Sequence, residues 1–241
     1  MTPPATLASA SDLDSLQIAG LVPFSTVDWP GQMVATVFLQ GCPWTCHYCH
    51  NPGLQPSTVP GTLAWENVWE LLCSRRGLLD GVVLTGGEPT RQPAALTAVR
   101  AARSLGYRVG LHTAGAYPER LAALLPELDW VGLDIKASRK AYRTLAGSPV
   151  AAERTWSSLA LIQASGVEFE VRSTVAPGMA QDVLLAAQEV REAGVQRYAI
   201  QQARAEGTTT IVDAHPPGWD EEFTDMAQAI EALGFDDFVL R

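Results

Sequence analysis

Seven short apolar runs are spread along the chain, and nearly every position within most of them is apolar. They cover Val34–Leu39, Gly81–Leu84, Tyr107–Leu111, Trp130–Ile135, Phe169–Val175, Tyr198–Ile200 and Phe235–Leu240. Such continuous runs are typical of parallel strands that are covered on both faces of a sheet. We therefore predict seven strands at these positions.

Segments with helical periodicity lie between the runs. Apolar residues recur at i, i+3, i+4, i+7 and i+8 in Trp65, Val68, Trp69, Leu72 and Cys73, and with a similar spacing in Phe223, Met226, Ala227, Ile230 and Leu233. Residues 93–105 and 181–193 are also predicted to be helical, and Gly106 and Gly194 follow them at the position that favours a left-handed cap.

This alternation of strands and helices predicts an α/β fold built of βαβ units around a parallel sheet. We count about six units, too few for a closed eight-stranded barrel, so we predict an open or partial barrel. The functional loops should then follow the C-terminal ends of the strands. Residues 1–17, rich in Ala, Ser, Thr and Pro, are predicted to be a flexible lead-in, and residues 18–241 a single domain.

The composition of the chain limits the classes of partner that it is expected to bind. The 241 residues are 47% apolar, as in a globular protein, and 17 Lys and Arg against 26 Asp and Glu give a net charge of −9. This balance argues against nonspecific binding to nucleic acid or a membrane surface. No apolar run reaches the roughly 18–20 residues of a membrane span. The first residues do not have the pattern of a signal peptide, so we expect a cytoplasmic protein.

Three of the four cysteines lie within one short segment, Cys42-Pro-Trp-Thr-Cys46-His-Tyr-Cys49, directly after the first predicted strand. Thiolates at this spacing suit zinc or an iron–sulfur cluster. His47 or His50 could complete a Cys3His zinc site; alternatively, the three cysteines hold a [4Fe–4S] cluster whose fourth iron stays open. Cys73, in the apolar stripe of the next helix, is predicted to be a buried core thiol.

Polar residues mark the ends of the later strands. Thr85-Gly86-Gly87-Glu88-Pro89 follows the second strand, and on its own it would read as a tight βα turn. The other strand ends carry His112-Thr113, Asp134 and Lys136, Arg172-Ser173-Thr174, and Gln201-Gln202. Because the C-terminal ends of parallel strands share one edge, we predict that these residues form one site.

The C-x3-C-x-aromatic-C spacing, with Tyr48 as the aromatic residue, and the Gly86-Gly87-Glu88 motif together resemble the radical S-adenosylmethionine (radical SAM) superfamily. The resemblance implies a partial (β/α)6-type barrel and one [4Fe–4S] cluster held by Cys42, Cys46 and Cys49. It further implies reductive cleavage of SAM, which is chelated at the open iron, to a 5′-deoxyadenosyl radical that abstracts hydrogen. The implied SAM-binding residues are Tyr48, Gly86, Gly87, Glu88, Thr113, Asp134, Lys136, Arg172 and Gln201.

Within that superfamily, several segments resemble glycyl-radical-enzyme activases of the short form that activates anaerobic ribonucleoside-triphosphate reductase. They are residues 20–31, Phe38–Cys42, Cys49–Pro52, Asp134-x-Lys136 and the terminal Phe238–Arg241. The resemblance implies that a glycine of the partner reductase loses a hydrogen atom. It also implies an external one-electron donor, such as flavodoxin or ferredoxin. A radical SAM enzyme acting on a small molecule, like a deazapurine synthase, and a non-catalytic zinc module remain the alternatives.

The chain departs from related activases at three points. His112-Thr113 stands where formate-lyase activases have an Asp-Thr pair that helps to bind a monovalent cation, so that site is in question here. Only Cys73 lies between Asn51 and Gly81, which leaves thiols for one cluster. Trp29 replaces a glycine, and it could contact a different partner loop or belong to the core.

Overall fold

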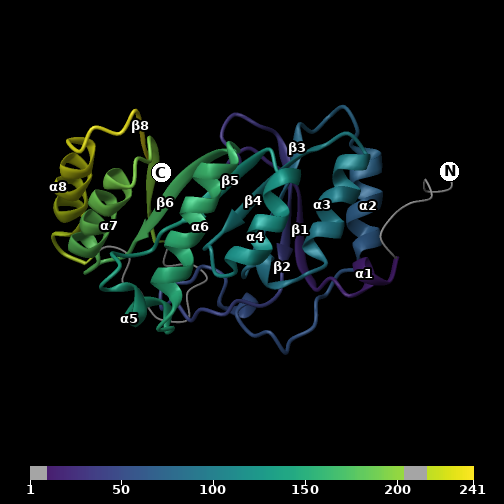
Figure 1. The fold of residues 1–241 in the computed structure, drawn as a ribbon, viewed down its shortest axis with the longest axis horizontal. Coiled ribbons are helices and arrows are strands. Elements are labelled where there is room, and N and C mark those ends of the chain that lie inside the picture. Colours follow the sequence, from purple (N-terminus) through teal and green to yellow (C-terminus); the bar gives the residue numbers. More distant parts are fainter. Residues whose placement is uncertain (1–9, 204–215) are drawn as a thin grey trace.

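A computed structural model describes residues 10–203 and 216–241. The strands form one sheet in the order β1 to β8 (Figure 1). They are β1 (Ile18–Ser25), β2 (Val34–Leu39), β3 (Gly81–Gly86), β4 (Arg108–Thr113), β5 (Trp130–Asp134), β6 (Glu168–Val175), β7 (Arg197–Gln202) and β8 (Asp237–Leu240). β1 is antiparallel to β2, and every later pair of neighbours is parallel. The seven predicted strands are confirmed as β2 to β8.

Helices follow each parallel strand from β2 to β7, and Figure 1 shows them along one face of the sheet. They are α2 (Trp65–Ser74), α3 (Ala95–Ser104), α4 (Pro118–Leu124), α5 (Tyr142–Ala146), α6 (Ala151–Ser165), α7 (Ala180–Glu192) and α8 (Trp219–Glu231). Four of them, α2, α3, α7 and α8, match the predicted helices. Gly106 and Gly194 have φ angles of 90° and 83°, which confirms the predicted left-handed caps.

The parallel sheet is an open partial barrel, as predicted. Six strand–helix units run from β2 to α8, and among the described residues no ladder joins β8 back to β1. The edge strand β1 was not predicted, because it is interrupted by Pro23 and only Ile18 and Ser25 of its eight residues are buried. Within the described part of the chain, we find no helix with the length and apolar character to cross a membrane.

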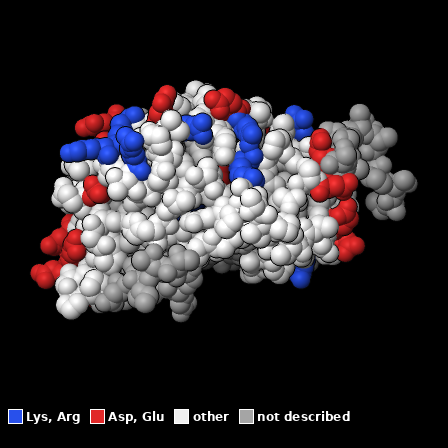
Figure 2. All heavy atoms as spheres, turned by 90° about the horizontal axis from the view of Figure 1, so that it is seen from below, with Lys and Arg blue, Asp and Glu red and all other residues white. Residues whose placement is uncertain are grey.

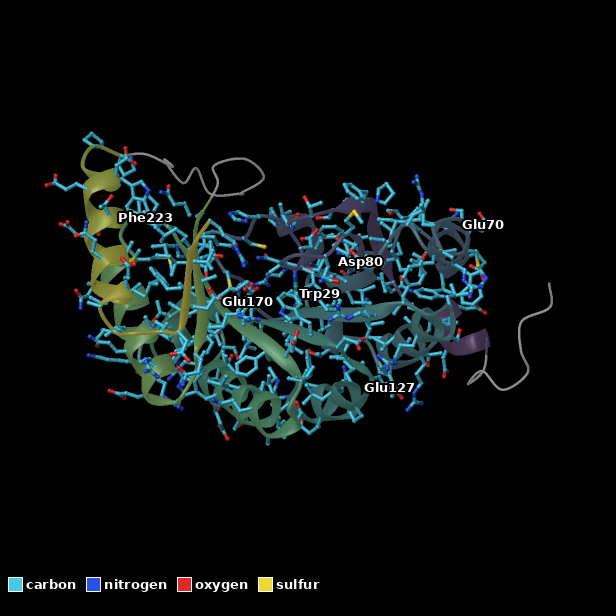
Figure 3. The ribbon with its side chains drawn as sticks, turned by 90° about the horizontal axis from the view of Figure 1, so that it is seen from above. Trp29, Glu70, Asp80, Glu127, Glu170 and Phe223 are labelled. Carbon is cyan, nitrogen blue, oxygen red and sulfur yellow. The ribbon has the colours of Figure 1, made fainter. Side chains whose placement is uncertain are left out.

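Trp29 belongs to the core and closes the inner side of the sheet at the N-terminal ends of the strands. It is 3% exposed and stacks on Trp130 with ring centroids 5.6 Å apart. Gly110 makes room for it, because a Cβ at Gly110 would lie 2.8 Å from the Trp29 ring. Figure 3 shows Trp29 in the interior of the molecule. The structure therefore supports the core alternative for Trp29.

The last part of the segment predicted as a lead-in, residues 10–17, packs against the rest of the domain. Helix α1 (Ala10–Asp14) forms, and Leu16 is buried. The amide of Gln17 donates to Gln92 Oε1 at 2.8 Å, and Gln92 Nε2 donates back to the Gln17 carbonyl at 3.0 Å. Local composition carried no sign of this pairing because the partner is 75 residues away. Residues 1–9 lie outside the described residues.

Candidate active site at the C-terminal edge of the sheet

The cysteine segment forms a compact loop that closes on itself after β2. The amides of Gly41 and Cys42 donate to the carbonyls of Leu54 and Gln55 at 2.8 and 2.9 Å, and the Cys49 amide donates to the Cys46 carbonyl at 3.2 Å. Cys46 is buried, and Cys42 and Cys49 are partly buried. We call residues 41–55 the cysteine loop. Its closure brings the three predicted cluster ligands onto one turn at the C-terminal edge of the sheet.

The thiols of this loop are a suitable donor set for an iron–sulfur cluster. Among the described residues, no three His, Cys, Asp or Glu side chains are gathered closely enough to hold a metal ion. Burial raises the pKa of Cys42 to about 12 and also raises the pKa of Cys46, so both thiols are protonated without metal. Metal binding would replace these protons, as it does at thiolate sites generally.

The prediction for Cys73 is wrong. Cys73 was predicted as a buried core thiol, yet it is exposed on α2. A helix turns by about 100° per residue, so Cys73 points well away from its buried neighbour Leu72. It lies outside the cysteine loop, which leaves three thiols at the candidate site.

A brace formed by α5 and the residue after it supports the cysteine loop. The rings of Trp44 and Tyr142 meet edge to face, with centroids 5.5 Å apart. The Thr45 amide donates to the Ala146 carbonyl at 3.3 Å. Gly147, at φ 66°, has no space for a side chain because a Cβ would lie 2.4 Å from Thr45 Oγ1. We call residues 142–147 the α5 brace; it fixes the stretch between Cys42 and Cys46.

The same brace reaches the end of β5. The Tyr142 hydroxyl donates to the Asp134 carbonyl at 3.3 Å and accepts from the Lys136 amide at 3.4 Å, while Thr155 Oγ1 donates to it at 3.3 Å. Sequence reasoning did not identify Tyr142 or Trp44 as site residues. Their contacts depend on how α5 packs, and neither residue lies in a motif.

Charged side chains from β5 and β6 meet beside the cysteine loop. Arg172 Nε donates to Asp134 Oδ1 at 2.9 Å, and Lys136 Nζ lies 3.9 Å from Asp134 Oδ2. Burial alone would raise the pKa of Asp134, but Arg172 and Lys136 hold it below its usual value. Burial would likewise lower the pKa of Lys136, but Tyr48, Asp134 and Cys46 raise it well above its usual value. The cluster of charges is therefore one carboxylate facing two permanent cations.

Tyr48 connects these charges to the cysteine loop. Its ring is buried, and Lys136 Nζ lies 5.9 Å from the ring centroid. The Tyr48 hydroxyl is buried as well, and it has no hydrogen-bond partner among the described residues. A buried hydroxyl without a partner is costly in a protein and is common where a ligand is still to be bound. The structure thus brings Tyr48, Lys136, Asp134 and Arg172 together, as predicted.

The Gly-Gly-Glu turn packs against the end of β2 and the base of the cysteine loop. A Cβ at Gly86 would lie 2.4 Å from the Leu39 carbonyl, and one at Gly87 would lie 2.5 Å from the Gly41 carbonyl. The Gly87 and Glu88 amides donate to those same two carbonyls at 2.9 Å. The glycines are needed because the turn touches the base of the cysteine loop.

Glu88 is fully buried, and its carboxylate accepts four hydrogen bonds from within the protein. The donors are the Thr90 amide, Thr90 Oγ1, Thr113 Oγ1 and the Ala114 amide. Burial raises the pKa of Glu88 although all four donors favour the ionised form. Here Glu88 and Thr113 hold the ends of β3 and β4 together; their contact with a ligand stays a prediction.

His112 occupies the inner face of the sheet below the charged cluster. Its Nε2 lies 2.6 Å from the Asp28 carbonyl, which can only accept, and 3.1 Å from Arg172 Nη1, which can only donate, so the two neighbours favour opposite tautomers. Burial and the nearby Arg172 guanidinium, with Nη1 at 3.1 Å, lower the pKa of His112 to about 3. His112 is therefore neutral. Gln201, the remaining predicted residue, donates to Thr174 Oγ1 at 2.9 Å and is half-buried.

Figure 2 shows the face on which this site opens, seen from the C-terminal ends of the parallel strands. Charged side chains lie mainly around its rim, with Lys and Arg along the side that the helices cover. The middle of the face carries few charged side chains. The charges described above are therefore set below the surface, as in a site that binds a small polar molecule.

Comparison with known proteins connects these site residues to a protein family. Residues 36–185 match the family model of the radical SAM superfamily, a range that contains the cysteine loop, the Gly-Gly-Glu turn and the charged cluster. A Methanocaldococcus jannaschii protein, provisionally assigned as a glycyl-radical enzyme activating enzyme, is 30% identical over 196 residues, which are 77% of this chain and 79% of that protein. The pyruvate formate-lyase-activating enzyme of Clostridium pasteurianum is 28% identical over 172 residues, 68% of each chain.

A solved structure shares the fold. The histidine-tagged form of anSMEcpe with bound AdoMet superimposes with a TM-score of 0.64 at 16% identity, over 84% of this chain and 59% of that one. This chain thus spans less than two thirds of that structure, and the likeness concerns the fold alone. Radical SAM enzymes use a [4Fe–4S] cluster and S-adenosylmethionine, which are the cofactors of this chain. The chain belongs to the radical SAM superfamily and is of the glycyl-radical-enzyme activating type.

Proposed function

We propose that this chain activates a glycyl radical enzyme, by using S-adenosylmethionine to remove one hydrogen atom from a glycine of that partner. The observation that carries the proposal is the position of Lys136, whose Nζ lies over the Tyr48 ring and near the Asp134 carboxylate. Lys136 thereby connects the charged ends of β5 and β6 to the cysteine loop. We further propose that the partner is an anaerobic ribonucleoside-triphosphate reductase, on the sequence segments that resemble its activases.

In this proposal Cys42, Cys46 and Cys49 hold the cluster. When bound, the cluster supplies the electron that splits SAM into methionine and the 5′-deoxyadenosyl group that takes the hydrogen atom. The protein residues bind and orient SAM for that step and exclude water from it.

The charged cluster is assigned to SAM. Lys136 and Arg172 present cations that suit the carboxylate of its methionine part, and Asp134 suits its ribose hydroxyls. Tyr48 has an unused buried hydroxyl at the same place. Gln201 lies at the neighbouring strand end. Gly86, Gly87, Glu88 and Thr113 are proposed to shape the wall next to the methionine part.

The proposed partner must bring its glycine to the inner side of the sheet, which fits a barrel that does not close between β8 and β1. A separate one-electron donor must reduce the cluster. Free thiols and an air-sensitive cluster suit the reducing cytoplasm, where we propose that the enzyme works.

Electron paramagnetic resonance on the partner tests the proposal. The protein is reconstituted with iron and sulfide without oxygen, reduced with dithionite, and mixed with SAM and an anaerobic ribonucleoside-triphosphate reductase or a pyruvate formate-lyase. We expect a glycyl-radical doublet on the reductase and little on the lyase. A doublet only on the lyase would move the assignment to that partner. SAM cleavage with no doublet on either protein would favour a small-molecule substrate.

A further inference from the structure

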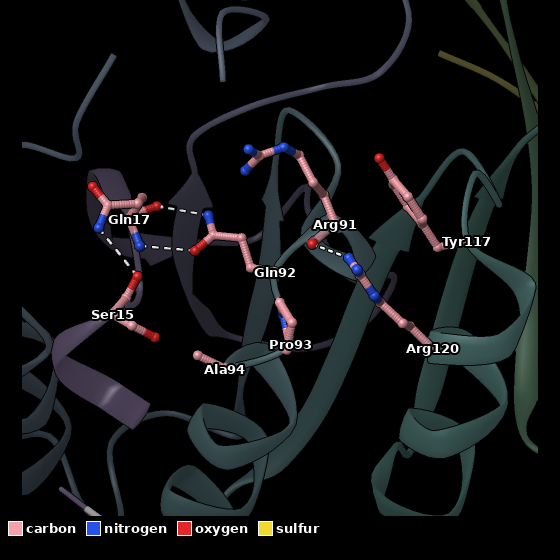
Figure 4. Close-up of a pocket in the computed structure, with 8 residues that line it drawn as sticks. All are labelled: Ser15, Gln17, Arg91, Gln92, Pro93, Ala94, Tyr117 and Arg120. Carbon is pink, nitrogen blue, oxygen red and sulfur yellow. Dashed lines mark hydrogen bonds between the residues drawn. The ribbon is translucent and has the colours of Figure 1, made fainter. Parts of the chain in front are cut away.

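A polar recess of about 340 Å³ lies on the outer side of the Gly-Gly-Glu turn, between α1 and the start of α4 (Figure 4). Arg91, Arg120 and Tyr117 line one side of it, and Gln17 and Gln92 line the other. The reciprocal hydrogen bonds of Gln17 and Gln92 fix the second side. The recess is therefore preformed, and its charged wall consists of arginine.

The arginines at this recess are not neutralised. Arg120 donates to the Thr90 and Arg91 carbonyls and lies over the Tyr117 ring, 4.9 Å from its centroid. Arg154 lies over the same ring at 5.8 Å and donates to the Ala116 carbonyl. In the described ranges, neither they nor Arg91 form an ion pair with a carboxylate, whereas Arg100 and Arg103 pair with Glu127.

These three arginines thus form a local positive surface on a chain whose net charge is −9. Glu119 and Glu153, exposed on the same helices, and Asp12 and Asp14, exposed on α1, moderate this charge. Backbone carbonyls and the Tyr117 ring hold the Arg120 and Arg154 guanidinium groups in place. We call Arg91, Arg120, Arg154 and Tyr117 the arginine surface. Fixed, unpaired cations are suited to guiding an acidic partner into place.

The arginine surface is backed directly by the cysteine loop. Arg91 packs on Gly41, where a Cβ would lie 2.9 Å from Arg91 Nη1. Gly41 immediately precedes Cys42, and its carbonyl accepts from the Glu88 amide. The Arg91 side chain therefore connects this outer surface to the start of the loop. Electron transfer between proteins weakens steeply with distance, so this is a suitable place for a donor to dock.

We propose that the arginine surface is the docking site of an acidic one-electron carrier protein that reduces the cluster. The inference rests on the proposed function, because it assumes that the cysteine loop holds the cluster. In the transfer, the reduced flavin or iron–sulfur centre of the carrier loses one electron and the cluster gains it, with no atom transferred. Such redox encounters need only a small interface, with less than about 1,200 Å² buried.

The test compares charge-reversal variants on and away from this surface. Arg154→Glu, Arg120→Gln and the double variant Arg120→Gln/Arg154→Glu change the surface while leaving Arg91 in place. Arg76→Glu is the matched control, because Arg76 is exposed just beyond α2, whose end lies at the opposite edge of the sheet. The probes are a purified acidic flavodoxin and a purified acidic ferredoxin.

Two readouts are taken, the carrier's dissociation constant and the rate at which the reduced carrier bleaches the cluster. For the double variant we expect a dissociation constant raised about tenfold and a similarly slower reduction, both shrinking at high salt. Reduction by dithionite should be unchanged in every variant, which shows that the fold and the cluster are intact. Arg76→Glu should match the wild type in all readouts.

Equal carrier binding and reduction in the double variant and the wild type would overturn the proposal. So would a defect that appears only in activating the glycyl radical partner with dithionite, since the surface would then belong to that partner. If the wild type takes up a cluster but cleaves no SAM, the proposed function fails, while carrier binding and reduction still decide the docking site.

Discussion

Trp44, between the first two cysteines, rests edge to face on Tyr142, whose hydroxyl bonds to the backbone of both Asp134 and Lys136. One side chain thus links the loop that carries the thiols to the strand end that carries the charges. Cluster and SAM must sit at a fixed distance for the reaction, and small displacements at such sites cost much of the rate. We regard Tyr142 as a positioning residue.

Tyr142→Phe tests this role. Phenylalanine keeps the contact with Trp44 and removes the long hydrogen bonds of the hydroxyl, each a modest contribution of about 1 kcal/mol or less. We expect cluster content close to the wild type and SAM binding weakened by about five- to tenfold, measured by calorimetry on the reconstituted protein. Tyr117→Phe, which removes a hydroxyl far from the charged cluster, is the control. Unchanged SAM affinity in Tyr142→Phe would show that the brace is only structural.

Asp134→Asn tests the charged cluster. Without the carboxylate, Arg172 and Lys136 face each other uncompensated, so we expect the free energy of unfolding of the metal-free protein to fall by about 1–3 kcal/mol at pH 7. Because the pKa of Asp134 is lowered in the folded state, its stabilisation is present above the unfolded pKa of about 3.9 and is lost as the pH falls below it. Urea unfolding at pH 7 and pH 3 should therefore show a smaller difference between variant and wild type at the lower pH. If the difference in unfolding free energy between variant and wild type were the same at pH 3 as at pH 7, Asp134 would not stabilise the protein through this ion pair.

His112 should impose a pH dependence of its own. Its folded pKa of about 3 lies below the unfolded value of about 6.5, so the unfolded chain binds a proton between these values and the folded protein does not. Stability should thus fall as the pH drops from about 6.5 towards 3. His112→Gln keeps a donor for the Asp28 carbonyl and removes the titration. We expect a shallower slope of unfolding free energy between pH 6.5 and 4.5; equal slopes would mean that the pKa of His112 is not lowered in the folded protein.

Trp29→Ala tests whether Trp29 stabilises the core or contacts the partner enzyme. Removing a large buried ring that stacks on Trp130 should cost about 3–5 kcal/mol of stability. Thermal unfolding of the metal-free protein measures this loss. If the variant unfolds like the wild type but activates its partner poorly, Trp29 would belong to the partner interface instead.

Much of this fold could be predicted because buried parallel strands are apolar on both faces and can be recognised one at a time. β2 was predicted with its observed bounds, Val34–Leu39, for this reason. β1 was not, since Gly20 and Pro23 interrupt its apolar residues and few of them are buried. The packing of residues 10–17 could not be foreseen because it involves a distant side chain, Gln92.

The site residues also divide into those that the sequence could predict and those that it could not. The cysteines, Asp134, Lys136 and Arg172 could be chosen because strand ends converge at one edge. The burial of Glu88 could not be foreseen, since its partners Thr90, Thr113 and Ala114 depend on how two strand ends pack. The exposure of Cys73 depends on the rotation of α2, which a spacing pattern fixes only roughly.

The formation of 5′-deoxyadenosine from SAM by the reconstituted, dithionite-reduced protein tests the central claim most directly. We expect the wild type and Cys73→Ala to form it and Cys46→Ala to form none, since Cys46 belongs to the cysteine loop and Cys73 does not. Production by Cys46→Ala at the wild-type rate, or none by a wild type that holds its full iron and sulfide, would contradict the account.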